Sequence, residues 1–492
     1  MAKGTHQITK KFFKDTTLYT IAKLLVTLRG IIILPLFSRT VGTEGYGLFS
    51  QIIITVILLT HFFSFQLDIA SVRYLSGERD KKTFQDSFYS ALIFVAFSGV
   101  FILVLMMAFR EETALIMFGG KEYTNFVIVG SLFLLFNILS ENILNFFRII
   151  NRIDLLSYIK FSQTAIEIAL ILLLVSIGHS IVYVIGIMIV IRVVLIVFVS
   201  PIILKQIGLP VLKWGKLKPM LKYSIPLMPN GLMNWAVNYA DRLVIVQYLS
   251  IAAIGTYSAS YSFGSLLNSI VGPIGFVLFP LVSKLWDQNK KEETKNYFLR
   301  ITRYFIMVAL PASLGLAMLS QPLLKIFATA QFTSSTFLVL WIALGVMFKG
   351  IFQINVYVFH LVHKTKYVAV ILLIGVLANI GLNILLVPKI GIEGAAVATL
   401  VTYIFIGLSA VYYGRIFLGY HLDLGAIGKV GVSTIIMAGI IHFIPSDSLL
   451  MIFINIITGV ILYFIVLYLV GGFLDEEVDY VKQRIFALTR CN

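Results

Sequence analysis

The sequence predicts an all-α integral membrane protein of about 14 transmembrane helices, and two observations support this fold class. Of the 492 residues, 59% are hydrophobic and only 13% are charged, and the mean hydropathy is +0.95. Soluble domains are closer to half apolar and a quarter charged. Apolar runs of about 18 to 24 residues recur from Leu18 to Gly471, and this length crosses about 30 Å of hydrocarbon.

Each apolar run gives one expected helix, and charged or turn-forming residues separate the runs. The longest connections have about 20 residues, which is too short for a separate catalytic domain. The expected spans are residues 18–38, 45–67, 87–109, 123–144, 156–177, 180–203, 223–245, 257–281, 301–319, 334–358, 367–387, 394–414, 429–444 and 449–471.

The positive charge is distributed unequally between the two sides of the membrane. The chain has a net charge of +16, and of its 39 Lys and Arg residues 29 fall on the side of the N-terminus, 6 on the opposite side and 4 within spans. The positive-inside rule therefore predicts a multi-pass protein of the cell (inner or plasma) membrane with both termini in the cytoplasm. Because this distribution reflects topology, we expect no nucleic acid as a partner.

A segment near the second expected helix repeats after 208 residues. VGTEGYGLFS at 41–50 aligns with LSIAAIGTYS at 249–258, and Gly47 then meets Gly255. The match equates the second and eighth helices, which are six helices apart, so the two halves have the same orientation about an axis along the membrane normal. Two such bundles suit alternating access in a transporter.

The repeat divides the chain into four expected parts. Two parallel six-helix bundles are joined by a cytoplasmic linker, and two accessory helices with a cytoplasmic tail follow them. The parts are residues 1–203 for the first bundle, 204–222 for the linker, 223–414 for the second bundle, and 415–492 for accessory helices 13–14 and the tail.

Polar residues recur on single faces of several expected helices. Interhelical hydrogen bonds, worth about 0.6 kcal/mol each, would explain any one stripe, whereas stripes in both halves favour a shared hydrated cavity. The stripes are Asn230, Asn234, Asn238 and Asp241 in the seventh span, Tyr257 and Tyr261 in the eighth, Asn137 and Glu141 in the fourth, and Lys160 and Glu167 in the fifth.

Four cations lie within spans, namely Lys23, Arg29, Arg192 and Lys349, and the most deeply placed carboxylate is Glu167. An ionisable group at the bilayer centre costs about 3 kcal/mol or more, so such groups face a partner or a wet cavity. Arg192 and Lys349 could instead extend to the lipid head groups, whereas Arg29 is near mid-span. The excess of positive charge predicts an anionic substrate.

Enzymatic and metal-binding patterns are not found in the sequence. The histidines lack metal-ligand spacing, GTEGYG at 42–47 lacks the Lys-Ser/Thr ending of a phosphate-binding loop, and the single cysteine, Cys491, allows no disulfide framework. We therefore expect no catalytic residues, no metal and no cofactor, apart from possible coupling to H+ or Na+.

Four segments resemble a known family: RTVGTEGYGLFS at 39–50, ASVRYLSGERD at 70–80, NYADRLVIVQYLSIAAIGTYSASYS at 238–262 and KIGIEGAAVAT at 389–399. They are similar to the Wzx-type polysaccharide flippases of the multidrug/oligosaccharidyl-lipid/polysaccharide exporter (MOP) superfamily, over nearly the whole chain. The resemblance implies a MATE-like fold. It also implies transfer of a polyprenyl-pyrophosphate-linked oligosaccharide from the cytoplasmic to the outer leaflet, in the synthesis of a cell-surface polysaccharide such as O-antigen or capsule.

The same resemblance implies roles for particular residues and partners. Lys23, Arg29 and Arg242 would form a cationic cavity for the pyrophosphate. Glu167, with Asp241 as second choice, would be the ion-coupling carboxylate. Membrane lipids and polysaccharide polymerase machinery are the further expected partners. The sugar would contact the polar and aromatic set Asn137, Glu141, Asn230, Asn234, Asn238, Tyr257 and Tyr261.

Two other functions remain open from the sequence. The first is a cation-coupled multidrug antiporter of the same superfamily, for which the excess of cations is unfavourable. The second is a membrane polysaccharide polymerase or ligase, which would need a large outer loop with acid and base residues, whereas the outer loops have about fourteen residues at most.

Overall fold

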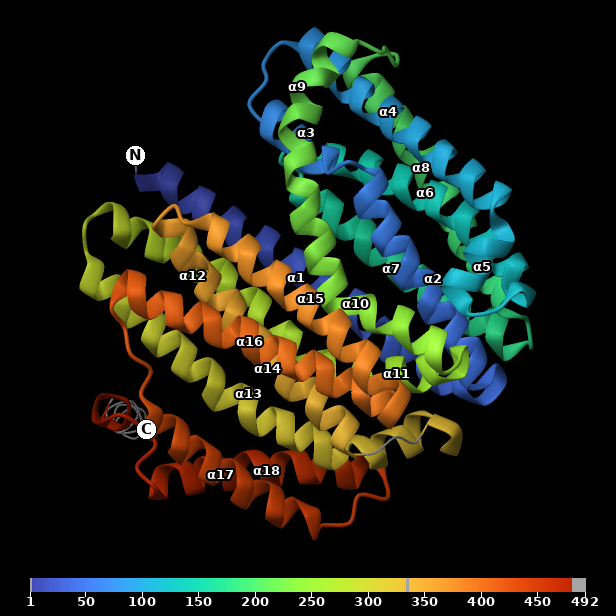
Figure 1. The fold of residues 1–492 in the computed structure, drawn as a ribbon. Coiled ribbons are helices and arrows are strands. Elements are labelled where there is room, and N and C mark those ends of the chain that lie inside the picture. Colours follow the sequence, from blue (N-terminus) through green and yellow to red (C-terminus); the bar gives the residue numbers. More distant parts are fainter. Residues whose placement is uncertain (1, 333–335, 480–492) are drawn as a thin grey trace, which may run out of the picture. The chain divides into compact units, whose positions relative to one another are not determined.

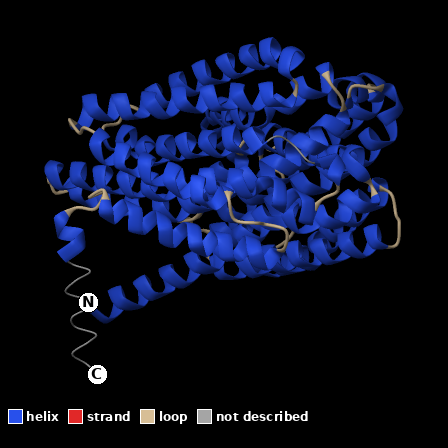
Figure 2. Cartoon of the chain, turned by 90° about the horizontal axis from the view of Figure 1, so that it is seen from below, coloured by secondary structure: helices blue, strands red, loops and turns tan. Residues whose placement is uncertain are grey.

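The computed structural model describes residues 2–332 and 336–479, and over this part of the chain it contains helices and loops but no strand (Figure 2). Cys491 and the end of the expected cytoplasmic tail lie outside the described residues. The all-α prediction is confirmed.

The described chain forms eighteen α-helices, which are labelled in Figure 1, and four short 3-10 helices. The α-helices are α1 (Ala2–Thr40), α2 (Gly42–Phe63), α3 (Leu67–Leu75), α4 (Lys81–Ala108), α5 (Arg110–Phe118), α6 (Thr124–Ile149), α7 (Ile153–Ser176), α8 (Ile181–Ile207), α9 (Trp214–Ser224), α10 (Met228–Tyr248), α11 (Ile251–Gly264), α12 (Asn268–Asp287), α13 (Lys291–Phe327), α14 (Thr336–Leu361), α15 (Thr365–Ile390), α16 (Ile392–Leu418), α17 (Leu424–His442) and α18 (Leu449–Leu469). The 3-10 helices are η1 (Lys121–Tyr123), η2 (Ile225–Leu227), η3 (Ser265–Leu267) and η4 (Ala330–Phe332).

Twelve helices within the described residues are long and apolar enough to cross a membrane. The other two expected spans, 223–245 and 257–281, correspond to α10 and to the segment α11–η3–α12. The polar stripe of α10 lowers its hydropathy, and the 3-10 turn η3 divides the second segment into two shorter helices. The chain is therefore a multi-pass membrane protein.

The helices group into two compact units. The first comprises Met1–Ser262, Phe327–Phe332 and Val376–Ala395, and the second comprises Phe263–Ile326, Thr333–Gly375 and Ala396–Asn492. Helices α10 and α11 thus pack with the first six spans, although the sequence assigns them to the second bundle. The expected division at 204–222 stays a prediction, because the compact units of one conformation do not reveal which helices move together.

The first unit has an aromatic core where α4, α6 and α8 meet. Phe146 and Phe147 are fully buried, and the rings of Phe84 and Phe146 lie 6.1 Å apart at right angles. Helix α10 attaches to α2 through Trp235, whose indole N–H donates to the Ile54 carbonyl oxygen at 3.2 Å. Trp235 is therefore a packing residue, and its hydrogen bond fixes the helix that carries Arg242.

The second unit packs the accessory helices α17 and α18 against α13. The Tyr463 hydroxyl donates to the Met307 carbonyl oxygen at 2.7 Å. After α18, the chain is held on α13 by an ion pair between Arg300 and Glu476 at 2.9 Å. The α17–α18 hairpin is thus fixed to this unit by an apolar face and a polar contact.

In the first unit, α2 and α11 cross at the two glycines that the repeat aligns. A Cβ atom added at Gly47 would lie 2.0 Å from the carbonyl oxygen of Ile251, and one added at Gly255 would lie 2.0 Å from that of Thr43. The same shift of 208 residues exchanges these two contacts, so the crossing has local two-fold symmetry. Only glycine permits such a close approach of two backbones.

Candidate functional site

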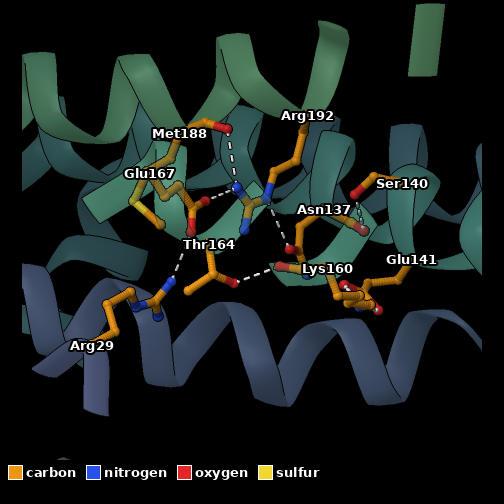
Figure 3. Close-up of polar contacts among 9 residues, drawn as sticks. All are labelled: Arg29, Asn137, Ser140, Glu141, Lys160, Thr164, Glu167, Met188 and Arg192. Carbon is orange, nitrogen blue, oxygen red and sulfur yellow. Dashed lines mark hydrogen bonds and ion pairs between the residues drawn. The ribbon is translucent and has the colours of Figure 1, made fainter. Parts of the chain in front are cut away.

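The first charged cluster of the first unit joins α1, α7 and α8 around one carboxylate (Figure 3). Glu167 binds Arg29 through Oε2 at 3.0 Å and Arg192 through Oε1 at closer range. The exposed fractions of the three side chains are 2% for Glu167, 17% for Arg29 and 7% for Arg192. Two guanidinium groups share one carboxylate, so the cluster has a net positive charge.

Arg192 is fixed by contacts on several sides. Its Nε donates to the Asn137 side-chain oxygen at 3.1 Å, one terminal nitrogen donates to the Met188 carbonyl oxygen at 3.2 Å, and the guanidinium lies 4.6 Å from the centre of the Phe133 ring. The expectation that Arg192 could extend to lipid head groups is therefore wrong. It lies near the middle of α8, too far from either end to reach them.

A second ion pair lies on the same two helices as Asn137 and Glu167. Lys160 on α7 binds Glu141 on α6 at 2.6 Å, and both side chains are partly exposed. Asn137 also donates to the Thr60 hydroxyl at 3.1 Å, which links α6 to α2. The stripes of the fourth and fifth expected spans thus face each other.

The second charged cluster surrounds Arg242 on α10. Its guanidinium binds the neighbouring Asp241 at 2.7 Å, and only 2% of the Arg242 side chain is exposed. The Tyr257 hydroxyl donates to the other oxygen of Asp241 at 2.6 Å. The rings of Tyr257, Tyr261 and Tyr239 lie 5.0, 4.3 and 5.4 Å from the guanidinium, an arrangement that stabilises a cation.

The two clusters lie near each other in the first unit. The Tyr46 hydroxyl donates to the carbonyl oxygen of Gly30, the residue after Arg29, at 3.4 Å. A Cβ atom added at Gly30 would lie 3.2 Å from the Oγ of Ser262, the residue after Tyr261. Arg242 is neutralised by its own carboxylate, whereas the Glu167 cluster retains an uncompensated positive charge.

The asparagine stripe of α10 is most exposed near the start of the helix. Asn230 and Asn234 are exposed, and the Asn234 amide donates to the Asn230 carbonyl and side-chain oxygens at 2.9 and 3.0 Å. Asn238 donates to the carbonyl oxygen of Asn234. In the described residues the contacts of Asn230 and Asn234 stay within their own helix, so these two side chains do not join helices together.

The remaining predicted site residues differ in how far they are exposed. Lys23 is exposed on α1, six residues before Arg29, and makes no ion pair with any described side chain. Tyr257 is fully buried and Tyr261 nearly so, so in this conformation their faces contact Arg242 rather than open space. No group of three or more histidine, cysteine, aspartate or glutamate residues in the described chain could hold a metal.

The sequence did not identify the pairing of these groups. Arg192 and Glu167 lie 25 residues apart on different helices, so no spacing rule predicts that they pair. A mid-span arginine needs a counter-charge, and Glu167 is the most deeply placed carboxylate. These two facts together could have predicted the pair.

Many spanning helices, with arginines and carboxylates paired inside the spans, form an architecture typical of membrane transport proteins. The solved structures with similar folds are of that kind. The chain superposes on a lipid II flippase MurJ in an inward closed conformation with a TM-score of 0.77 and 18% identity, over 92% of this chain and 98% of the other. It superposes on an inward-facing multidrug resistance MATE family transporter of the MOP superfamily with a TM-score of 0.64 and 13% identity, over 81% and 94% of the two chains.

The sequence comparisons give the family. The chain matches the polysaccharide biosynthesis protein family over residues 12–286, more than half of its length, and belongs to that family. One relative is a probable low-salt glycan biosynthesis flippase of Haloferax volcanii, 21% identical over 250 residues. That match covers 50% of this chain and 53% of the relative, so the chain spans about half the length of this relative. The predicted family and the MATE-like fold are confirmed.

Proposed function

We propose that the protein is a flippase that moves a polyprenyl-pyrophosphate-linked oligosaccharide from the cytoplasmic to the outer leaflet of the cell membrane. The main support is the Glu167 cluster, in which one buried and one partly exposed arginine share one carboxylate inside the spans. A guanidinium binds phosphate oxygens through paired hydrogen bonds. Arg29, the more exposed of the two arginines, is the cation that we assign to the pyrophosphate, with Lys23 one to two turns away on the same helix.

The oligosaccharide would contact the exposed asparagine stripe of α10. Asn230 and Asn234 offer amide donors and acceptors, and among the described residues their hydrogen bonds stay within α10. The named relative supports this substrate class, because it is called a probable glycan biosynthesis flippase. Arg242 would act as a fixed, neutralised group beside the site. The cytoplasmic location of both termini, and a polysaccharide polymerase as partner, belong to the same proposal.

Coupling to H+ or Na+ is a further part of the proposal. Glu167 and Asp241, the two candidate carboxylates, are each bound to arginine. An ion bound to either carboxylate would weaken its bond to arginine. At Glu167 this would free Arg29 for the anionic substrate, so ion binding and substrate binding would favour each other.

Transport of cationic drugs is the second candidate, because a MATE family transporter has a similar fold. The net positive charge of the Glu167 cluster disfavours a cationic substrate, since like charges repel strongly where water is scarce. A membrane polymerase or ligase has no support from the relatives or from the folds.

The proposal is tested by reconstituting the protein in liposomes. We expect transfer of a pyrophosphate-linked polyprenyl oligosaccharide between leaflets, detected by loss of access to a sugar-modifying reagent added outside, and no export of a cationic dye under a H+ or Na+ gradient. Export of the dye by properly inserted protein that moves none of a panel of such lipids would replace the flippase with a drug antiporter.

A further inference from the structure

We infer that Glu167 is a built-in competitor for the anion that Arg29 binds, and that it sets how tightly the site holds its substrate. In the unloaded protein the Glu167 carboxylate occupies the place on Arg29 that a phosphate oxygen takes in the loaded protein. The inference rests on the proposed function and adds to it the group that limits affinity and permits release.

The contacts around Glu167 are unequal on its two sides. Arg192 is held by Asn137 and by the Met188 carbonyl oxygen, in addition to Glu167 (Figure 3). The face of Phe133 packs on it as well. Among the described residues, the only hydrogen-bonding partner of the Arg29 guanidinium is Glu167. The bond from Glu167 to Arg29 is therefore the one that can open without disturbing the rest of the cluster.

The exposed fractions of the three side chains also indicate that Arg29 is the group an incoming anion can reach. The side chain of Arg29 is 17% exposed, whereas those of Glu167 and Arg192 are 2% and 7% exposed. A guanidinium has five N–H donors, and Glu167 accepts from Arg29 at a single nitrogen. An incoming anion can therefore approach Arg29 from its exposed side and find free donors.

The exchange leaves no buried charge alone. When phosphate oxygens replace Glu167 on Arg29, Glu167 remains bound to Arg192, so the large penalty for an unpaired buried carboxylate does not arise. When the anion leaves, Glu167 returns to Arg29. This competition weakens binding and makes release faster, as a transporter requires, since a site that holds its substrate too tightly turns over slowly.

The test is the Glu167→Gln variant, which keeps the size of the side chain and can still accept a hydrogen bond from Arg192 but loses the negative charge. Binding of inorganic pyrophosphate and of a short-chain polyprenyl pyrophosphate to the purified protein is measured by calorimetry. We expect Kd to fall by about tenfold or more, and the rate of leaflet transfer to fall because release is slower. Glu111→Gln is the matched control, since Glu111 pairs with Lys121 at 3.1 Å on the exposed end of α5.

The possible results distinguish failure of the inference from failure of the proposed function. Tighter binding of either probe by Glu167→Gln, absent from Glu111→Gln and lost again when Arg29→Ala is added, supports the inference. Unchanged or weaker binding in Glu167→Gln, with binding by the unmodified protein abolished in Arg29→Ala, overturns the inference and leaves the flippase proposal standing. No binding of either probe by any variant overturns both.

A second variant covers the case in which Glu167→Gln does not fold. In Glu167→Asp the shorter carboxylate cannot span both arginines, so we expect a smaller decrease in Kd in the same direction. An increase in Kd for this variant contradicts the inference.

Discussion

Replacement of Gly47 by alanine is expected to disfavour the described conformation by about 100-fold. The added Cβ atom would lie 2.0 Å from the carbonyl oxygen of Ile251, and two backbones cannot retain such a contact. The helices α2 and α11 must separate, and overpacking of this kind costs up to about 3 kcal/mol, which corresponds to about 100-fold in population. Gly255→Ala is expected to have the same effect, because its Cβ would meet the Thr43 carbonyl oxygen at the same distance.

The measurements are the unfolding midpoint in detergent and the rate of leaflet transfer. Gly186→Ala is the matched control, because Gly186 lies within α8 and a Cβ atom there has no neighbour within 4 Å. We expect both crossing variants to lose stability and transfer while the control retains them. If Gly47→Ala behaves like Gly186→Ala, the close crossing is not needed for the transport cycle.

Replacement of Asp241 by asparagine is expected to destabilise the protein by about 3 to 5 kcal/mol, which is the usual cost of breaking a buried ion pair from one side. The variant leaves Arg242 buried with no counter-charge. Its amide also has one oxygen, whereas the carboxylate offers one each to Arg242 and Tyr257. The readout is the free energy of unfolding in detergent. Chemical denaturation of the variant and the unmodified protein gives the difference directly.

Two further variants show whether the lost charge is the cause. The double variant with Asp241→Asn and Arg242→Met should recover much of the lost stability, because it removes the unpaired cation. Glu293→Gln breaks an exposed pair with Lys290 at 2.9 Å and should cost at most about 1 kcal/mol. A loss for Asp241→Asn no larger than that for Glu293→Gln would contradict the structural role of the pair.

Much of the fold was predictable because membrane insertion leaves a strong signal in the sequence. The runs at 87–109 and 180–203 correspond to α4 and α8, since a span must be continuously apolar over a fixed length. The short helices α3, α5 and α9 were not predicted, because they are not apolar runs. The first helix is also longer than expected, beginning at Ala2 rather than at residue 18, because helical hydrogen bonding can continue beyond the membrane boundary.

The sequence indicated which charged residues lie in the candidate site, but not which of them pair with each other. Arg29 was identifiable as a candidate functional residue, because an arginine at mid-span is costly. The choice of Glu167 as partner for both Arg29 and Arg192 depends on how α1, α7 and α8 pack. Likewise, no spacing rule links Tyr257 to Asp241, since the contact joins two consecutive helices across a turn.

The anion-binding role of Arg29 is tested most directly by leaflet transfer of a pyrophosphate-linked polyprenyl oligosaccharide in liposomes containing Arg29→Ala. This variant should still fold, because Glu167 keeps its bond to Arg192. We expect the transfer rate to fall by about 10- to 100-fold, as for the loss of a hydrogen bond to a charged group. Arg29→Lys, which keeps the charge but not the planar fork, should give an intermediate rate. Transfer by folded, correctly inserted Arg29→Ala at the rate of the unmodified protein would contradict the account.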